Sequence, residues 1–100
     1  MSNYLLAFRG TPKAASTAAQ DATWASWFRG MGPAIVDSGH RVGAFTTIGS
    51  EGRPVQDGGS EPLRGYILVR ADSLEAALDL ARGCPILQAG GHVEVGETFD

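Results

Sequence analysis

A single cysteine occurs in the sequence, and this scarcity excludes a disulfide within the chain. Lysine and arginine number 8 against 11 aspartates and glutamates and form no cluster, which argues against a nucleic-acid partner. No apolar run approaches the roughly 20 residues of a membrane-spanning helix, and no charged segment leads into an apolar one near Met1. We therefore expect a cytoplasmic protein without a membrane partner, since a lone thiol is typical of a reducing compartment.

Histidine is also scarce, with two residues, His40 and His92. Neither belongs to an H-x-H, an H-x-x-x-H or a cysteine–histidine spacing, which are arrangements typical of metal sites. The sequence also lacks a phosphate-binding loop, a dinucleotide-binding glycine motif and the Gly-x-Ser-x-Gly turn of serine hydrolases. We therefore expect no metal and no cofactor. Cys84 directly follows a predicted helix C-terminus, which disfavours the thiolate, so we interpret it as a packed apolar residue.

The residues that are present suffice for one small domain over residues 1–100, because 43% are hydrophobic and 19% charged. The apolar run at 3–9 predicts a strand buried on both faces. The stretch 11–23, rich in Ala, Ser and Thr, indicates a loop, either mobile or partly helical because of its alanine content. Asp21 is a candidate N-cap for a helix over 21–37, with Gly39 as its left-handed cap.

That first helix has one apolar face at helical spacing. The face consists of Trp24, Trp27, Phe28, Met31 and Ile35. The Gly-Pro pair at 32–33 predicts either a kink or a restart of the helix, because proline lacks a backbone donor.

The second half of the chain predicts two strands and a helix after a moderately clear strand over 41–48 and a loop over 49–60. Residues 63–71 alternate as a strand does. A helix follows, capped either by Ser73 or by Asp72 in a complete capping box, which we prefer. Gly83 and Pro85 end it. Residues 92–99 predict the last strand.

The resulting order, β-α-β-β-α-β, is that of a ferredoxin-like α+β fold. Two helices would cover one face of a four-stranded antiparallel sheet. Tyr66 and Leu68 would then lie on the other face, which nothing in so short a chain can cover. Since exposed apolar faces of this kind usually mark an interface, we expect a homodimer that packs sheet on sheet.

Several segments resemble the YCII-related family, also called the DGPF-domain family. The segments are YLLAFRG at 4–10, GYILV at 65–69, ADSLEAA at 71–77, GCPIL at 83–87 and GGHVEV at 90–95. The resemblance covers most of the chain, and its C-terminal half is the specific part. It implies a dimeric α+β barrel and a family mostly of undefined function.

Some members of that family resemble enzymes that use a His-Asp pair, with the histidine near the start of the first helix. Residues 1–39 contain no histidine here, so this pair does not carry over. Of the family's Asp-Gly-Pro-Phe motif only Asp57 and Gly58 can be matched, because Gly59 and Ser60 follow.

His92 is the strongest candidate for a chemical role. It precedes Glu94 by two positions, so both side chains would share the strand face opposite Val93 and Val95. An imidazole beside a carboxylate can act as an acid or base, and a polar residue at a strand end or dimer interface has the same pattern. Asp57 is the second catalytic candidate, as an acceptor at a pocket mouth, or else an ordinary Asp-Gly turn residue.

The ligand-binding candidates are Arg9, Trp24, Trp27, Tyr66 and Glu94. The two tryptophans share a helix face, where they either fill the core or place one indole N–H in a pocket between sheet and helix. Arg9 would anchor an anion, or else be a solvated charge.

Two functions follow from these candidates. The first is a dimeric module that binds a small molecule in a pocket between the sheet and the first helix. The alternative is a small lyase-like or isomerase-like enzyme that uses a His-carboxylate acid/base pair.

Overall fold

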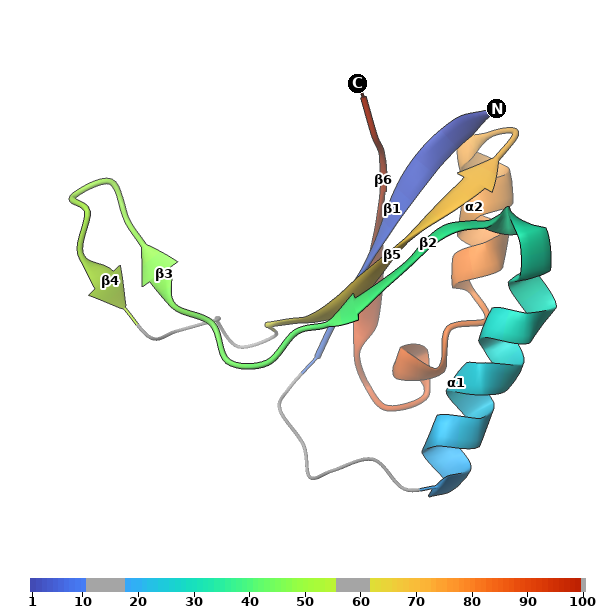
Figure 1. The fold of residues 1–100 in the computed structure, drawn as a ribbon, viewed down its shortest axis with the longest axis horizontal. Coiled ribbons are helices and arrows are strands. Elements are labelled where there is room, and N and C mark those ends of the chain that lie inside the picture. The colour runs from blue at the N-terminus through green and yellow to red at the C-terminus, as the bar shows by residue number, and fades with distance from the viewer. Residues whose placement is uncertain (11–17, 56–61, 100) are drawn as a thin grey trace.

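The fold is a four-stranded antiparallel sheet with two α-helices, seen in a computed structural model that describes residues 1–10, 18–55 and 62–99 (Figure 1). The sheet order is β2-β5-β1-β6. The elements of the main body are β1 (Ser2–Arg9), α1 (Ala18–Met31), β2 (Ile35–Arg41), β5 (Leu63–Ala71), α2 (Leu74–Ala81) and β6 (His92–Glu97). This arrangement confirms the predicted ferredoxin-like α+β fold.

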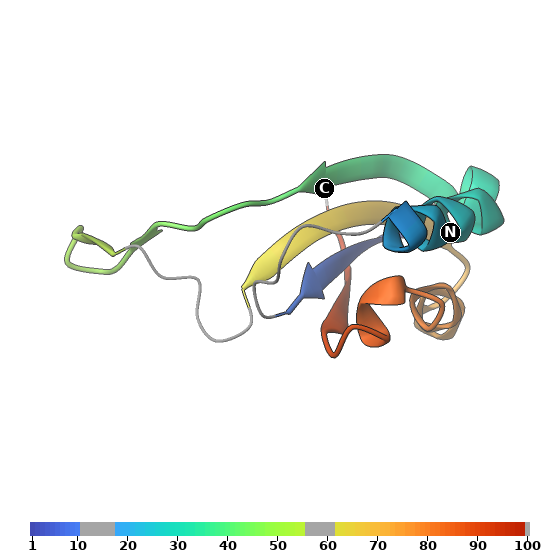
Figure 2. The ribbon, with the colours of Figure 1, turned by 90° about the horizontal axis from the view of Figure 1, so that it is seen from below.

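The helices lie together on one side of the sheet, and a separate hairpin projects on the other side (Figure 2). The hairpin pairs β3 (Thr47–Ile48) with β4 (Pro54–Val55), and we call it the arm. It was predicted as a strand end and a loop. Its apolar side chains are exposed, Ile48 by 69% and Val55 by 56%. No helix in the described part of the chain is long and apolar enough to cross a membrane.

The core lies between the helices and the sheet, and strand alternation decides which residues enter it. Tyr4, Leu6 and Phe8 of β1 are buried, whereas Leu5 between them is 36% exposed. The prediction that this strand is buried on both faces is therefore wrong for the single chain. The other core residues are Met31, Ile67, Val69, Ala71, Ala77, Ala81 and Cys84.

The predicted boundaries of the first helix are wrong. Helix α1 already begins at Ala18, so Asp21 lies in its first turn. It ends at Met31, and Gly32 follows with a φ of 51°, the left-handed conformation with which many helices end. A 3-10 turn, Gly32–Ala34, then leads into β2.

The second strand therefore lies earlier than the predicted 41–48. Ile35 and Val36 are β-branched and favour a strand once Pro33 has prevented the helix from continuing. Gly39, predicted as a helix cap, is instead an irregular position within β2, where the pairing register with β5 shifts between Asp37 and His40.

The second helix is capped by Ser73, whose hydroxyl accepts a hydrogen bond of 3.2 Å from the Ala76 N–H. The preferred assignment of Asp72 as the cap is therefore wrong, and the other assignment is confirmed. β5 occupies the predicted residues, and β6 ends at Glu97 rather than at residue 99.

Candidate functional site

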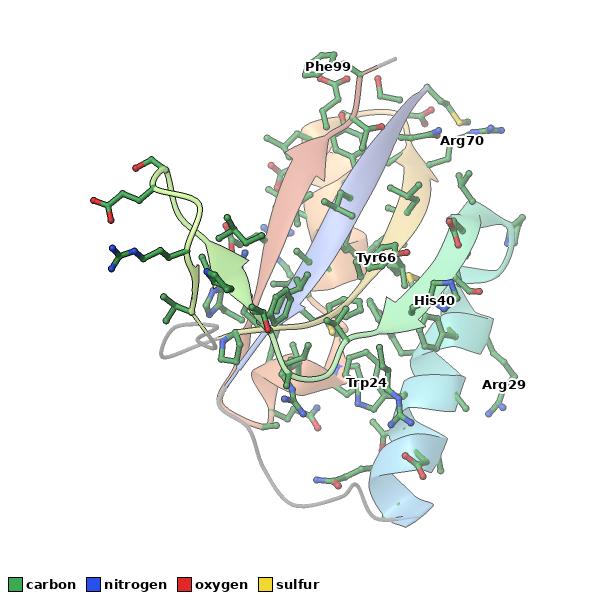
Figure 3. The ribbon with its side chains drawn as sticks, turned by 60° about the vertical axis from the view of Figure 1, so that its left-hand side comes forward. Trp24, Arg29, His40, Tyr66, Arg70 and Phe99 are labelled. Carbon is green, nitrogen blue, oxygen red and sulfur yellow. The ribbon has the colours of Figure 1, made fainter. Side chains whose placement is uncertain are left out.

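An open cleft of about 1000 Å³ lies between the first half of α1 and the end of the sheet where β1 finishes and β5 begins. Its walls come from α1, β1, β2 and β5 and from the segment around the 3-10 turn Pro85–Leu87. Figure 3 shows Trp24, His40 and Tyr66 gathered at this end of the molecule, whereas Arg70 and Phe99 lie at the other.

The apolar wall of the cleft is part of a cluster of four aromatic rings. Trp24 contacts both of the other rings that face the cleft. Its ring centroid lies 5.2 Å from that of Phe8 and 6.2 Å from that of Phe28. All three of these residues line the cleft. The spacing that puts the aromatic side chains of α1 on one helix face thus also builds this wall.

The ring of Trp27, the fourth of the cluster, lies 5.7 Å from that of Trp24 and packs, partly buried, against the core. Its indole N–H donates a hydrogen bond of 3.1 Å to the Leu80 carbonyl and so joins α1 to α2. For the Trp24 N–H, by contrast, the described residues provide no acceptor. The indole N–H of Trp24 is therefore available to a ligand in the cleft, whereas that of Trp27 is already hydrogen-bonded.

The rim of the cleft is polar and contains two arginines. Arg41 of β2 and Arg64 of β5 line it, together with His40. Among the described lining residues Asp21 is the single acid. Neither arginine has an acidic partner within 1–10, 18–55 and 62–99. These two guanidinium groups are thus not neutralised by the part of the chain that the structure describes.

The strand register explains why Arg41 reaches the cleft. Gly65 lies between Phe8 and Arg41 in the sheet, paired with the first on β1 and the second on β2. Directly paired residues project to the same face, so Arg41 shares the helix-covered face with Phe8. A Cβ at Gly65 would lie 3.0 Å from the His40 carbonyl oxygen and 3.6 Å from Phe8 Cδ2. The glycine therefore lets the neighbouring groups approach closely.

A second group of polar residues lies on the opposite face of the sheet. Arg9 Nε forms an ion pair with Glu94, and His92 Nε2 lies 4.0 Å from Glu94 Oε1. Val93 and Val95 pack against the core, so His92 and Glu94 share the face away from the helices, as predicted. At 4.0 Å the imidazole is beyond hydrogen-bond distance of the carboxylate.

Of the predicted site residues that the structure describes, only Trp24 and Tyr66 line the cleft, and Tyr66 does so at its edge, because its pairing with Ala7 places it on the open face of the sheet. Arg9, His92 and Glu94 form the separate group just described. Trp27 is hydrogen-bonded within the fold, and Asp57 lies outside the described residues. Their roles in catalysis or ligand binding stay predictions.

The basic rim was missed because the strand that carries it was placed wrongly. The predicted helix cap at Gly39 left His40 between the first helix and the next strand, and made Arg41 the first residue of that strand. The signal that would have located them is Gly32-Pro33 followed by the β-branched pair at 35–36, which predicts a helix stop and a strand start.

Cys84 is a buried thiol, and the described acidic residues form no metal-binding cluster. Burial raises the pKa of the Cys84 thiol to about 11, against a smaller lowering by a backbone hydrogen bond from Ile86. It is 1% exposed, which agrees with its interpretation as a packed apolar residue. Within the described residues no cluster of three or more His, Cys, Asp or Glu side chains could hold a metal ion.

Comparison with known proteins identifies the family. No curated protein matches the chain. The family model of the YCII-related domain matches residues 4–99, which includes every element of the sheet and both helices apart from the first residues of β1. The chain therefore belongs to the family of YCII-related domains.

Proposed function

We propose that this protein is a dimeric module that binds a small molecule in the cleft between α1 and the sheet. The observation that carries this proposal is the half-buried Trp24, whose ring is part of an apolar wall and whose N–H has no acceptor in the described chain. A site that combines an apolar wall with a few polar groups is typical of small-molecule binding. The ligand would stack on the indole and accept its hydrogen bond.

The geometry supports this function better than acid/base catalysis by His92. Glu94 is already paired with Arg9, and neither His92 nor Glu94 lines the cleft. A lyase-like or isomerase-like reaction would require a substrate on the opposite face of the sheet, where the described part of the single chain provides no comparable wall of rings.

The dimer would form through the face of the sheet that the helices leave open. Leu5, Tyr66 and Leu68 share this face with Ala7, by their register in β1 and β5. The arm projects from the same side (Figures 1 and 2), and its two strands pair only with each other. Because an isolated two-stranded hairpin is marginally stable in water, contact with a second copy would stabilise the arm as well as cover the open face.

Nuclear magnetic resonance of the ¹⁵N-labelled protein tests the binding site. Small aromatic fragments should shift the indole resonance of Trp24 and the amide of Gly65. The variant Trp24→Ala should lose this binding, whereas His92→Ala should retain it. Fragments that shift residues around His92 and leave Trp24 unchanged would refute the proposed site and favour the enzyme.

Light scattering at micromolar concentration tests the dimer. We expect a mass near twice the 10.4 kDa of one chain. Leu5→Glu, on the open face, should give a monomer, because it places a charge in the interface. Leu74→Glu, at an α2 residue that is 51% exposed, is the matched control and should leave the mass unchanged. A mass near one chain for the unsubstituted protein would refute the dimer.

A further inference from the structure

We infer that the cleft selects small organic acids, namely molecules that join an aromatic ring to a carboxylate; the inference rests on the proposed function of the cleft. Two arginines and one acid line it within the described chain, and neither arginine is neutralised there. A binding site of this charge favours an anion over a neutral molecule of the same shape.

The position of Arg41 relative to the aromatic wall defines the shape of the ligand. Arg41 projects from β2 on the face that α1 covers, by its pairing with Gly65. Phe8, Trp24 and Phe28 form the apolar wall of the same cleft. A ring against Trp24 would therefore have its acidic group toward the strands, where guanidinium groups bind carboxylates through paired hydrogen bonds.

The carboxylate of Asp21 would repel an anionic ligand, but its position in the cleft limits this repulsion. It lies on α1, whereas both arginines lie on the strands. It also already interacts within the chain. The cleft thus has an acidic residue on its helix side and basic residues on its sheet side, which would orient an acid in one direction.

The test compares phenylacetate with phenylacetamide, which has nearly the same shape and no charge. In ¹⁵N titrations both should shift the Trp24 indole, and phenylacetate should bind about tenfold more tightly at low salt. The double variant Arg41→Gln/Arg64→Gln should abolish this preference and leave the affinity for phenylacetamide within about twofold. The preference should also shrink with added salt.

The matched control is Arg29→Gln/Arg70→Gln, which removes the same charge outside the cleft. Figure 3 shows Arg29 on the outer side of α1 and Arg70 at the far end of β5. This variant should keep the tenfold preference. Equal affinities in the unsubstituted protein would refute the selection of acids and leave the binding site standing. The selection of acids would also be refuted if Arg41→Gln/Arg64→Gln still preferred phenylacetate, or if the control variant lost this preference to the same extent. If neither probe shifts Trp24, the proposed function fails as well.

Discussion

Replacement of Gly39 by alanine should be among the most damaging single changes in this chain. Gly39 has a φ of 63°, in the left-handed region that side chains rarely adopt. Its N–H donates a hydrogen bond of 2.8 Å to Asp37 Oδ1, which helps to hold the backbone in this conformation. A Cβ at this position would lie 1.7 Å from the Tyr66 carbonyl oxygen. Because that atom belongs to the backbone of the neighbouring strand, no rotation of a side chain can relieve the clash.

Alanine substitutions at three glycines separate the loss of stability caused by backbone strain from the loss caused by the steric clash. At Gly30, near the end of α1, nothing lies within 4 Å of the position that a Cβ would occupy and φ is not positive, so alanine should stabilise the protein by about 0.5–1 kcal/mol. At Gly32 φ is 51° and the space is open, so strain alone should cost about 1–2 kcal/mol. Gly39→Ala adds the clash, and we expect a loss of about 3 kcal/mol or more.

Urea denaturation followed by circular dichroism measures these differences, at one protein concentration because the stability of a dimer depends on it. For a domain of this size about 3 kcal/mol corresponds to a melting temperature lower by roughly 12 °C or more. The expected order of stability is Gly30→Ala, then Gly32→Ala, then Gly39→Ala. A loss for Gly39→Ala that equals the loss for Gly32→Ala would refute the close approach of β2 to β5 at this position.

The remaining predictions concern the helices and the buried thiol. Ser73→Ala should lower the free energy of unfolding by about 1 kcal/mol and Asp72→Ala by less than about 0.5 kcal/mol, and the reverse order in urea titrations would contradict the observed cap. Trp27→Phe should cost about 1–3 kcal/mol, because it removes the indole donor to the Leu80 carbonyl, which keeps the longer hydrogen bond of 3.4 Å from the Gly83 N–H. Trp24→Phe should cost less, and equal losses would contradict this. Cys84 should resist a thiol reagent until urea unfolds the protein, and rapid labelling of the native state would contradict its burial. Folding raises the pKa of the Cys84 thiol from 9.0 to about 11. The contribution of the buried thiol to stability is therefore complete below pH 9 and is lost as the pH rises toward 11. The stability of Cys84→Ala should not fall in this way between pH 9 and 11.

The C-terminal half of the fold was predictable because its signals are local and agree with one another. Residues 63–71 alternate as a strand, and β5 occupies the same residues. The apolar spacing of the following helix predicts a buried face of Leu74, Ala77, Leu78 and Ala81. Ala77 and Ala81 are buried, whereas Leu74 in the first turn is 51% exposed. The two-residue spacing of His92 and Glu94 likewise predicted that they share a face. In each case a pattern within a few residues of the chain is sufficient to predict the element or the face.

The second strand could not be predicted in the same way, because its pattern is interrupted. β2 contains two register irregularities within Ile35–Arg41, so its side chains do not alternate regularly. A glycine with positive φ is typical both of a helix end and of such a strand irregularity. Gly39 was therefore assigned to the helix end, and Gly32, which does end the helix, was interpreted as the site of a kink or a restart of the helix.

That single misassignment also explains why the cleft was only half predicted. Its apolar wall depends on helical spacing, which is visible in the sequence, so Trp24 was identified. Its basic rim depends on the pairing of β2 with β5, which joins Arg41 to Gly65 across 24 positions of the chain and is a tertiary property. The irregularity at Gly39 brings His40 opposite Tyr66 and Arg41 opposite Gly65, and a regular strand would exchange their faces. Gly39 thus decides on which face of the sheet Arg41 lies, and a change at Gly39 should alter binding at the rim as well as stability.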